Sequence, residues 1–314
     1  MNDTQILSPS ERILLKGSAG FKFLKRLKKI QKPIIAIDIS NALTASIVHS
    51  YNSNFFESSW ISSLGFSLER GFEDAYTLSP RDYMQKIQEI KLKVPEQFLI
   101  VDADNGGQSY KNTGYAFELY GSLGVHLAFV ENKSGVKCNS LAKNVEHTLE
   151  KKDIFANKIK AAIKSQNHCL VGIRIEDAIV NDDNSELALR EALETVEYYM
   201  EHSKPDFFLF HWKKEDPIIP LKFAKEYKKR FNYIKNLPHL ACVPTTYSKN
   251  ISNLALYNSG YEVIIYGNPL LRTHIQGVLN TLEQIEKSDS LKIFDQSSFS
   301  LKELMKLNGK VKQE

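Results

Sequence analysis

The chain has 314 residues, of which 42% are hydrophobic and 25% are charged, and its net charge is only +4. These values are ordinary for a globular protein, and one α/β barrel of about 250 residues would account for most of the length. No apolar run approaches the roughly 20 residues that a membrane-spanning helix needs, and the N-terminus shows no secretory signal. Three widely spaced cysteines, Cys138, Cys169 and Cys242, argue against a disulfide framework and a structural zinc site. We therefore expect a cytoplasmic protein.

A basic segment lies within residues 1–32, which we expect to form a separate N-terminal helical segment. Its basic residues are Lys22, Lys25, Arg26, Lys28, Lys29 and Lys32. Because Phe23 and Leu27 lie between them, the segment could bind nucleic acid or a membrane surface. Basic surface helices are common, so we favour a helix that covers one end of the fold with its charges in water. We expect neither nucleic acid nor membrane as a partner.

Eight short runs rich in β-branched and aromatic residues follow, and amphipathic segments separate them. The runs are Pro33–Ile39, Asn54–Trp60, Gln97–Asp102, Val125–Glu131, Cys169–Glu176, Asp206–Trp212, Leu240–Pro244 and Glu262–Tyr266. Most are nearly continuously apolar, as is typical of parallel strands buried on both faces. The repeated alternation of strand and helix favours a (β/α)₈ barrel over residues 33–314, although an open sheet also fits the pattern.

The segments between these runs have helical periodicity. Residues Arg81–Val94 and Glu186–His202 place apolar side chains at helical spacing, and Asn268-Pro269 is a predicted helix start. Two connections are unusually long, Ile61–Ser79 and Asn132–Glu150. Long loops within a compact domain usually carry function, so we expect both to contribute to a binding site.

Polar and charged residues gather at the carboxyl ends of the predicted strands. In chain order they are Ser62, Asp74, Asp102, Asp104, Glu131, Arg174, Glu176, His211, Thr245 and Asn268. In a (β/α)₈ barrel these strand ends converge on the face that holds the active site. The sequence therefore predicts one site that contains acids, a guanidinium group, an imidazole and hydroxyl groups.

The acids at this face, Asp74, Asp102, Asp104 and Glu131, indicate a divalent metal. Two like charges about 4 Å apart repel by about 4 kcal/mol at an effective dielectric constant of about 20, so clustered carboxylates need a cation or bound protons. Oxygen ligands favour Mg²⁺, Mn²⁺ or Ca²⁺ over zinc. Taken singly, Asp104 could cap a helix and Glu131 could form an ordinary ion pair. Similarly, Arg174 and His211 could bind phosphate or carboxylate, or could be a salt-bridged arginine and a buried structural histidine.

Three short motifs lie at or after the ends of the predicted strands: Trp60-Ile-Ser62-Ser-Leu64, Gly71-Phe-Glu-Asp74 and Asp102-Ala-Asp104-Asn-Gly106. They resemble the patterns W-x-S-G-L, G-x-x-D and D-A-D-x-G of the phosphoenolpyruvate mutase/isocitrate lyase superfamily. Further on, Glu131-Asn132-Lys133 resembles E-D-K, and Asn268-Pro-Leu-Leu-Arg272 also aligns in order. The resemblance covers about Pro33 to Leu307, which is nearly the whole chain.

The resemblance implies a Mg²⁺-dependent barrel enzyme that acts on a small phosphorylated or phosphonylated 2-oxo acid. It also implies a homo-oligomer, a tetramer or dimer, in which the last helix is swapped onto a neighbouring subunit. The metal would be ligated by Asp102, with Asp74, Asp104 and Glu131 holding its waters. The substrate carboxylate and pyruvyl group would lie against Trp60, Ser62, Ser63 and Leu64. The phosphoryl group would lie against Asn139, Arg174 and His211.

The loop after the fourth strand distinguishes branches of the superfamily. Carbon–carbon lyases carry K-[KR]-C-G-H there, whereas this chain reads Lys137-Cys138-Asn139-Ser140-Leu141, similar to the mutases and phosphonopyruvate hydrolases. Lys137 and Asn139 then belong to a gating loop over the phosphoryl group. We favour the interconversion of phosphoenolpyruvate and phosphonopyruvate, a step of phosphonate biosynthesis. The alternatives are phosphonopyruvate hydrolysis, carbon–carbon cleavage or condensation that uses Cys138, and, least favoured, a non-catalytic barrel.

Some neighbours of the matched residues depart from the superfamily pattern. Ser63 replaces a glycine, Asn132 replaces the acid of E-D-K, and Trp212 follows His211 where a small residue is usual. Glu73 stands where an arginine often precedes Asp74. These changes indicate a divergent member, with a different 2-oxo acid or a bulkier substrate as one explanation.

Overall fold

The computed structural model describes residues 14–51, 54–75, 78–135, 139–140, 142, 146–181, 183–291, 299–300 and 302–303. It divides into two compact units, Met1–Asn268 and Pro269–Glu314. Within the described parts of the chain, no helix is both long and apolar enough to cross a membrane. The division of the fold at residue 32 stays a prediction.

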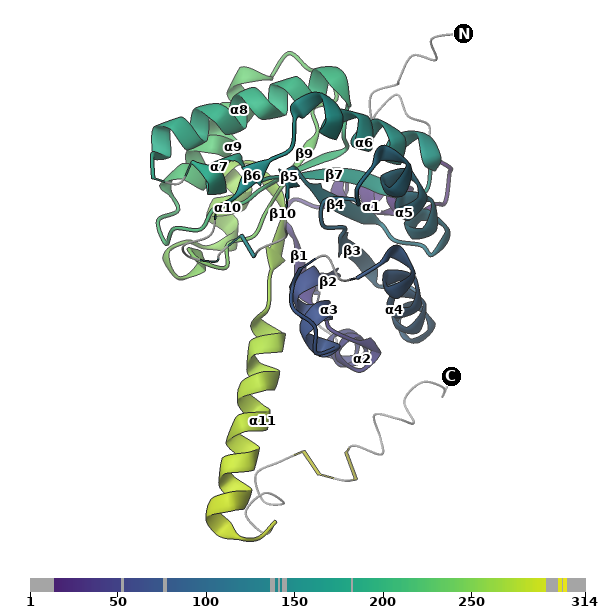
Figure 1. Ribbon diagram of the computed structural model, residues 1–314, viewed down its shortest axis with the longest axis vertical. Helices are drawn as coiled ribbons and strands as arrows, with labels where there is room; N and C mark the ends of the chain where they lie inside the picture. The colour runs from purple at the N-terminus through teal and green to yellow at the C-terminus, as the bar shows by residue number, and fades with distance from the viewer. Residues whose placement is uncertain are drawn as a thin grey trace. The chain divides into compact units, whose positions relative to one another are not determined.

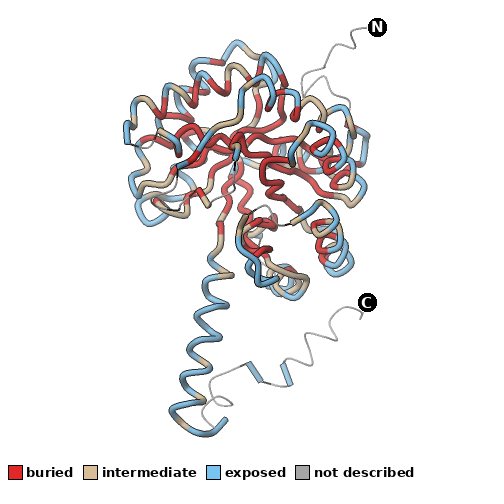
Figure 2. Tube along the Cα trace, in the orientation of Figure 1, coloured by how far each residue is buried: buried red, intermediate tan, exposed pale blue. Residues whose placement is uncertain are grey.

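The first unit is a closed barrel of eight parallel strands, in the order β1-β10-β9-β8-β7-β4-β3-β2 (Figure 1). Its strands are β1 Ile34–Asp38, β2 Phe56–Ile61, β3 Phe98–Asp102, β4 Leu127–Glu131, β7 Leu170–Ile175, β8 Phe207–Phe210, β9 His239–Cys242 and β10 Tyr261–Tyr266. Every predicted run contributes one strand, so the (β/α)₈ prediction is confirmed. Continuous burial explains the apolar runs, because the strands lie between the barrel interior and the surrounding helices (Figure 2).

Helices connect the strands around the outside of the barrel. Their bounds are α1 Ala19–Leu27, α2 Ala42–Ser50, α3 Ser63–Glu69, α4 Pro80–Lys93, α5 Tyr110–Ser122, α6 Lys152–Ser165, α7 Asp177–Val180, α8 Ser185–His202, α9 Ile218–Arg230 and α10 Asn253–Ser259, with a short 3₁₀ turn at Ser248–Asn250. The predicted helices at Arg81–Val94 and Glu186–His202 are confirmed within one residue at either end. Both long connections contain structure: the first holds α3, and the second holds a short hairpin of β5 Lys133–Ser134 and β6 Thr148–Leu149.

The basic N-terminal helix α1 packs against the amino ends of the strands. Phe23 is fully buried, and its ring lies 5.3 Å from Phe98 and 6.2 Å from Phe207, which begin β3 and β8. The basic side chains of the segment lie at the surface or are only partly covered. The described part of this segment therefore contains a helix, Ala19–Leu27, that covers one end of the barrel, whereas residues 1–13 lie outside the described residues.

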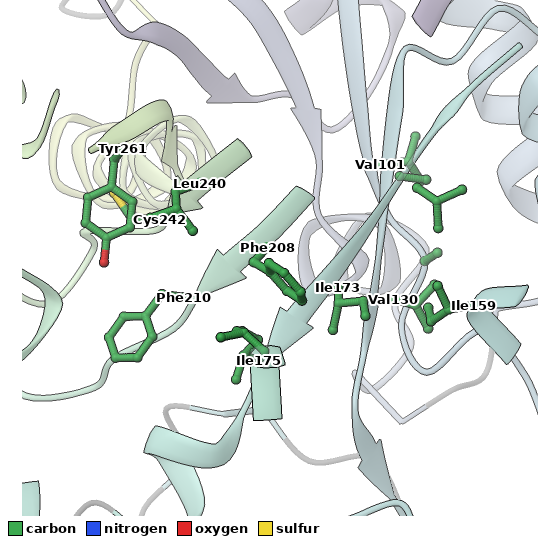
Figure 3. Packing of buried hydrophobic residues seen from close by; sticks show 14 of the residues in the cluster. Val101, Val130, Ile159, Ile173, Ile175, Phe208, Phe210, Leu240, Cys242 and Tyr261 are labelled. Carbon is green, nitrogen blue, oxygen red and sulfur yellow. The ribbon is translucent and has the colours of Figure 1, made fainter. Parts of the chain in front are cut away.

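Two layers of apolar side chains stabilise the barrel. The outer layer lies between the strands and the helices and includes Val101, Ile173 and Phe208 (Figure 3). The inner layer fills the barrel and includes Trp60, Phe129 and Phe207. A closely packed interior of this kind leaves little room for extra atoms.

The second unit contains one long helix, α11 Pro269–Ser288, which begins at the predicted Asn268-Pro269 start. None of its residues is buried. Four apolar side chains at helical spacing are roughly half exposed: Ile275, Val278, Leu279 and Leu282. A stripe of this kind on one face of a helix is suited to packing against another apolar surface.

The interior packing predicts that Gly172→Ala destabilises the barrel. A Cβ atom at Gly172 would lie 2.4 Å from the Phe129 ring, so the ring or the strand would have to move. We expect the free energy of unfolding to fall by about 1–3 kcal/mol, measured by chemical denaturation. Gly114→Ala in α5 is the matched control, because its nearest neighbour would be at an ordinary 3.6 Å. An unchanged Gly172→Ala variant would contradict the packing described here.

Candidate active site

The carboxyl ends of the barrel strands enclose a small pocket of about 80 Å³. Its lining residues are Trp60, Ser62, Ser63, Leu64, Asp74, Asp102, Asn139, Ser140, Arg174, His211, Val243, Thr245, Gly267 and Asn268. Most of the predicted site residues therefore meet in one place. Ligand pockets for drug-sized molecules usually enclose about 300–1,000 Å³, so this one suits a much smaller ligand.

Helix α3 brings Ser62, Ser63 and Leu64 to the pocket. Ser62 is its N-cap, and the Ser62 hydroxyl accepts a hydrogen bond from the Gly65 N–H over 3.3 Å. This cap fixes the direction in which the chain leaves β2, and it places Ser63 and Leu64 in the first helical turn. N–H groups of a first helical turn have no acceptor within the helix, so they suit an anionic group of a ligand.

The turn after β3 brings Asp102 and Asp104 together. Asp104 has a positive φ of 51°, and Gly106 has a φ of 72°. A Cβ atom at Gly106 would lie 2.9 Å from the Thr113 side chain, so glycine is required at this point. Within this turn the Asp104 N–H lies 3.3 Å from Asp102 Oδ1, which accepts its hydrogen bond.

Arg174 lies at the centre of the charged groups. Its guanidinium group donates from Nη1 to Asp102 Oδ2 over 2.8 Å, from Nε to Glu176 Oε1 over 2.6 Å, and from Nη2 to Glu131. Burial alone would lower the pKa of Arg174, but the surrounding carboxylates raise it well above its ordinary value. These three bonds use three of the five N–H groups of arginine, which leaves donors for an anionic ligand.

Glu176 links Arg174 to His211. Its fully buried Oε1 atom accepts hydrogen bonds from Arg174 Nε and from His211 Nδ1, the latter over 3.0 Å. Burial would raise the pKa of Glu176, but Arg174 and His211 hold it well below its ordinary value. An ionised carboxylate only accepts, so His211 carries a proton on Nδ1 and its Nε2 atom can serve the pocket.

The predicted metal acids divide into two groups. Asp74 and Asp102 line the pocket, whereas Glu131 contacts Arg174 and Asp104 contacts Asp102 through its backbone. Among the residues that the structure describes, no three acidic, histidine or cysteine side chains converge as a ready-made metal site. Mg²⁺ usually binds one or two carboxylates and keeps several waters, so the oxygen donors of Asp102 and Asp74 fit this ion.

A model of the phosphoenolpyruvate phosphomutase family matches residues 23–286 of the chain. The chain belongs to this family.

Individual relatives are similar to this phosphomutase-family chain over most of their length. A phosphonopyruvate hydrolase from Variovorax sp. (strain Pal2) is 26% identical over 252 residues, which cover 80% of this chain and 82% of the relative. A phosphoenolpyruvate phosphomutase from Tetrahymena pyriformis is 25% identical over 290 residues, which cover 91% of this chain and 90% of the relative. The crystal structure of a phosphoenolpyruvate phosphomutase from Streptomyces platensis subsp. rosaceus has a TM-score of 0.81 and 25% identity, and covers 93% of this chain and 96% of its own.

Sequence reasoning missed part of the charged network of this phosphomutase-family barrel. Glu176 was recognised at a strand end but was given no role. The available signal is its spacing from Arg174, because residues two apart on a strand point to the same side. Lys133, which is 3% exposed, was also missed: its Nζ atom lies 3.7 Å from Glu131 and donates to the Ser140 hydroxyl over 2.9 Å. Lys137 and Cys138 lie outside the described residues.

Two departures from the family pattern affect different parts of the fold. The Ser63 hydroxyl donates to Asp102 Oδ2 over 3.3 Å, so this side chain contacts the predicted metal ligand. Trp212 belongs to the outer core and donates to the Asp216 carbonyl over 3.0 Å. Trp212 does not line the pocket. It therefore changes the packing behind His211.

We predict that Glu176→Gln weakens both stability and anion binding. The glutamine keeps the shape but loses the charge that holds Arg174 and His211, so at neutral pH unfolding should become easier by roughly 1.5–3 kcal/mol. Because the pKa of Glu176 is lowered on folding, its contribution is present above about pH 4.3, the ordinary pKa of glutamate, and is lost as pH falls through the folded-state pKa. The pH dependence of unfolding below about pH 4.3 should therefore be shallower in the variant.

Glu262→Gln provides the matched control for this experiment. Glu262 accepts a hydrogen bond from His239 Nδ1 over 2.8 Å, and neither residue lines the pocket. We expect this variant to lose stability without losing affinity for phosphate or oxalate, measured by calorimetry. Equal losses of affinity in both variants would contradict the role given to Glu176.

Proposed function

We propose that the chain catalyses the Mg²⁺-dependent interconversion of phosphoenolpyruvate and phosphonopyruvate. The observation that carries this proposal is the composition of one small pocket. It holds a guanidinium and an imidazole group for a phosphoryl group, the first turn of α3 for a carboxylate, and two metal-type acids, Asp74 and Asp102. A three-carbon acid with one phosphoryl or phosphonyl group presents the complementary charges.

In this proposal the substrate phosphoryl group lies against Arg174, His211 and Asn139. The remaining guanidinium N–H groups then donate to its oxygens, and His211 Nε2 is the ring nitrogen that Glu176 leaves for the phosphoryl group. The substrate carboxylate lies against the backbone N–H groups of Ser63 and Leu64, with Trp60 and Ser62 beside the pyruvyl plane. Lys137 and Asn139 act as part of the loop that closes over the phosphoryl group.

The oxygen donors at the pocket fit Mg²⁺, which Asp102 would hold directly while Asp74, Asp104 and Glu131 hold its waters. Bound there, the metal would supply positive charge that stabilises negative charge developing on the substrate oxygens. A crystal structure titled as a complex of phosphonopyruvate hydrolase with oxalate and Mg²⁺ shares the fold, with a TM-score of 0.78 and 23% identity. It supports the expectation that this type of barrel can present such a pocket.

In this proposal the residues of the chain position the substrate and exclude water from its phosphorus atom. Phosphoryl transfer passes through a loose, metaphosphate-like state, so charge stabilisation and alignment matter more than covalent chemistry. Moving phosphorus between the enol oxygen and C3 of the same pyruvate needs a closed site, because a stray water would give phosphate instead.

The second candidate is phosphonopyruvate hydrolysis, which the Variovorax relative favours at 26% identity. It needs the same groups and one water beside phosphorus. Carbon–carbon cleavage is less well supported, because the described cysteines, Cys169 and Cys242, are buried in the outer core and do not line the pocket. Cys138, which motivates that alternative, lies outside the described residues.

Phosphorus NMR distinguishes these reactions. We expect the chain with Mg²⁺ and phosphonopyruvate to produce phosphoenolpyruvate, and we expect EDTA to stop the reaction. The change Asp102→Asn should slow it by at least roughly 100-fold, as loss of a key electrostatic group does in other enzymes. Inorganic phosphate and pyruvate as the products would select hydrolysis instead. Full activity in both EDTA and the Asp102→Asn variant would reject the metal assignment.

We also propose that the chain is a homo-oligomer that associates through α11, as the family resemblance implies. The support is the apolar stripe of Ile275, Val278, Leu279 and Leu282, whose side chains are 45–59% exposed. A second copy is the proposed partner, and the resemblance places the helix on its barrel as a swapped element.

Charge placed on this stripe should dissociate the oligomer. We expect Leu279→Glu/Leu282→Glu to reduce the mass measured by light scattering to that of one chain, because burying two carboxylates at an apolar interface is strongly unfavourable. Gln284→Glu, on the opposite face of α11, is the control and should keep the mass of the natural protein. A natural protein that is already monomeric would reject this proposal.

A further inference from the structure

Behind the pocket, buried hydrogen bonds join the ends of β4 and β7 to α8, and we call this cluster the β4–β7 lock. Asn132 donates from Nδ2 to Asp177 Oδ2 over 2.8 Å, and its Oδ1 atom accepts the Glu176 backbone N–H over 2.9 Å. The other Asp177 oxygen accepts the Thr195 hydroxyl over 2.5 Å. Each residue of the lock is at most 1% exposed, so water does not compete for these hydrogen bonds.

The β4–β7 lock requires an amide at position 132 and a carboxylate at position 177. Burial raises the pKa of Asp177, and the hydrogen bonds that its carboxylate accepts from Thr195 and Asn132 offset part of this rise. The Glu176 N–H needs an acceptor. Only a side chain with both a donor and an acceptor can face these two groups together, and asparagine has both. This is one of the positions where the chain departs from the E-D-K pattern, which has an acid there.

The lock lies directly behind the charged groups of the pocket. Asn132 follows Glu131, which contacts Arg174, and the Asn132 backbone N–H donates to the Arg174 carbonyl over 3.2 Å. Asp177 follows Glu176, which contacts Arg174 and His211. A displacement of Asn132 or Asp177 would therefore be transmitted to both of these carboxylates, which hold the guanidinium group.

We propose that Asn132 and Asp177 are positioning residues for this site, and that they act as a matched amide–carboxylate pair which fixes Glu131, Arg174 and Glu176. Neither residue lines the pocket, so neither is expected to touch the substrate. The inference rests on the proposed function only for the choice of substrate in the assay.

An exchange of the two side chains tests the pair. Asn132→Asp alone places two carboxylates against each other, and we expect kcat to fall by roughly ten-fold or more, as for other groups that orient site residues. Adding Asp177→Asn restores a matched pair with the roles reversed. The new carboxylate at position 132 accepts from the Glu176 N–H and from the new amide at position 177, whose oxygen accepts from Thr195. The exchanged variant should recover kcat to within about three-fold of the natural protein, because geometry rather than residue identity is required.

Asn181→Ala is the control within the same region. Asn181 Nδ2 donates to the Asp177 backbone carbonyl over 3.0 Å and leaves its carboxylate untouched, so this variant should keep natural kinetics. Natural kcat in Asn132→Asp, or an exchanged variant as slow as Asn132→Asp, would overturn the proposal. If Asn132→Asp does not fold, the exchanged variant decides alone: folded and active supports the pair, and unfolded or inactive rejects it.

Two further measurements keep this test separate from the proposed function. The first is the dissociation constant for oxalate with Mg²⁺, measured by calorimetry, and the second is the thermal midpoint of unfolding. Both should show a loss in Asn132→Asp and a recovery on exchange. If the natural protein converts no phosphonopyruvate, the proposed function fails, while these two measurements still support or reject the positioning pair.

Discussion

The site depends on one interaction, the contact of the Arg174 guanidinium group with the carboxylates of Asp102, Glu131 and Glu176. These residues come from the ends of β3, β4 and β7, which are neighbours in the barrel. Three buried carboxylates outnumber the two cations of Arg174 and Lys133, whose Nζ atom lies 3.7 Å from Glu131, and burying charge is costly unless it is compensated. A cation at the pocket would balance this excess, which is why the network and the metal proposal belong together.

The barrel makes this contact possible through strand register. Glu131 pairs directly with Arg174 across β4 and β7, so their side chains leave the sheet side by side. The close fit of Gly172 against Phe129 lies two residues earlier on both strands and fixes this register from within the barrel. The packed interior therefore determines the position of the charged groups at the carboxyl ends of the strands.

Family membership bears on the fold of the chain, whereas the choice between the candidate reactions depends on the site. The family match covers residues 23–286 and is consistent with the barrel fold. The mutase and hydrolase reactions need similar groups, and they differ in whether water reaches phosphorus. The similarity to a phosphoenolpyruvate phosphomutase supports the mutase reaction, and the similarity to a phosphonopyruvate hydrolase keeps hydrolysis as the second candidate.

The sequence by itself determined the eight strands, the main helices and the residues at the strand ends, because burial on both faces leaves a local pattern of apolar runs. It also placed Arg174, His211 and Asp102 at one face, since parallel strands end together. Only the tertiary structure decided which groups pair: Glu176 with His211, and Asn132 with Asp177. The partners in these pairs are 35 and 45 residues apart, so their contact follows from strand register and loop geometry and leaves no local pattern in the sequence.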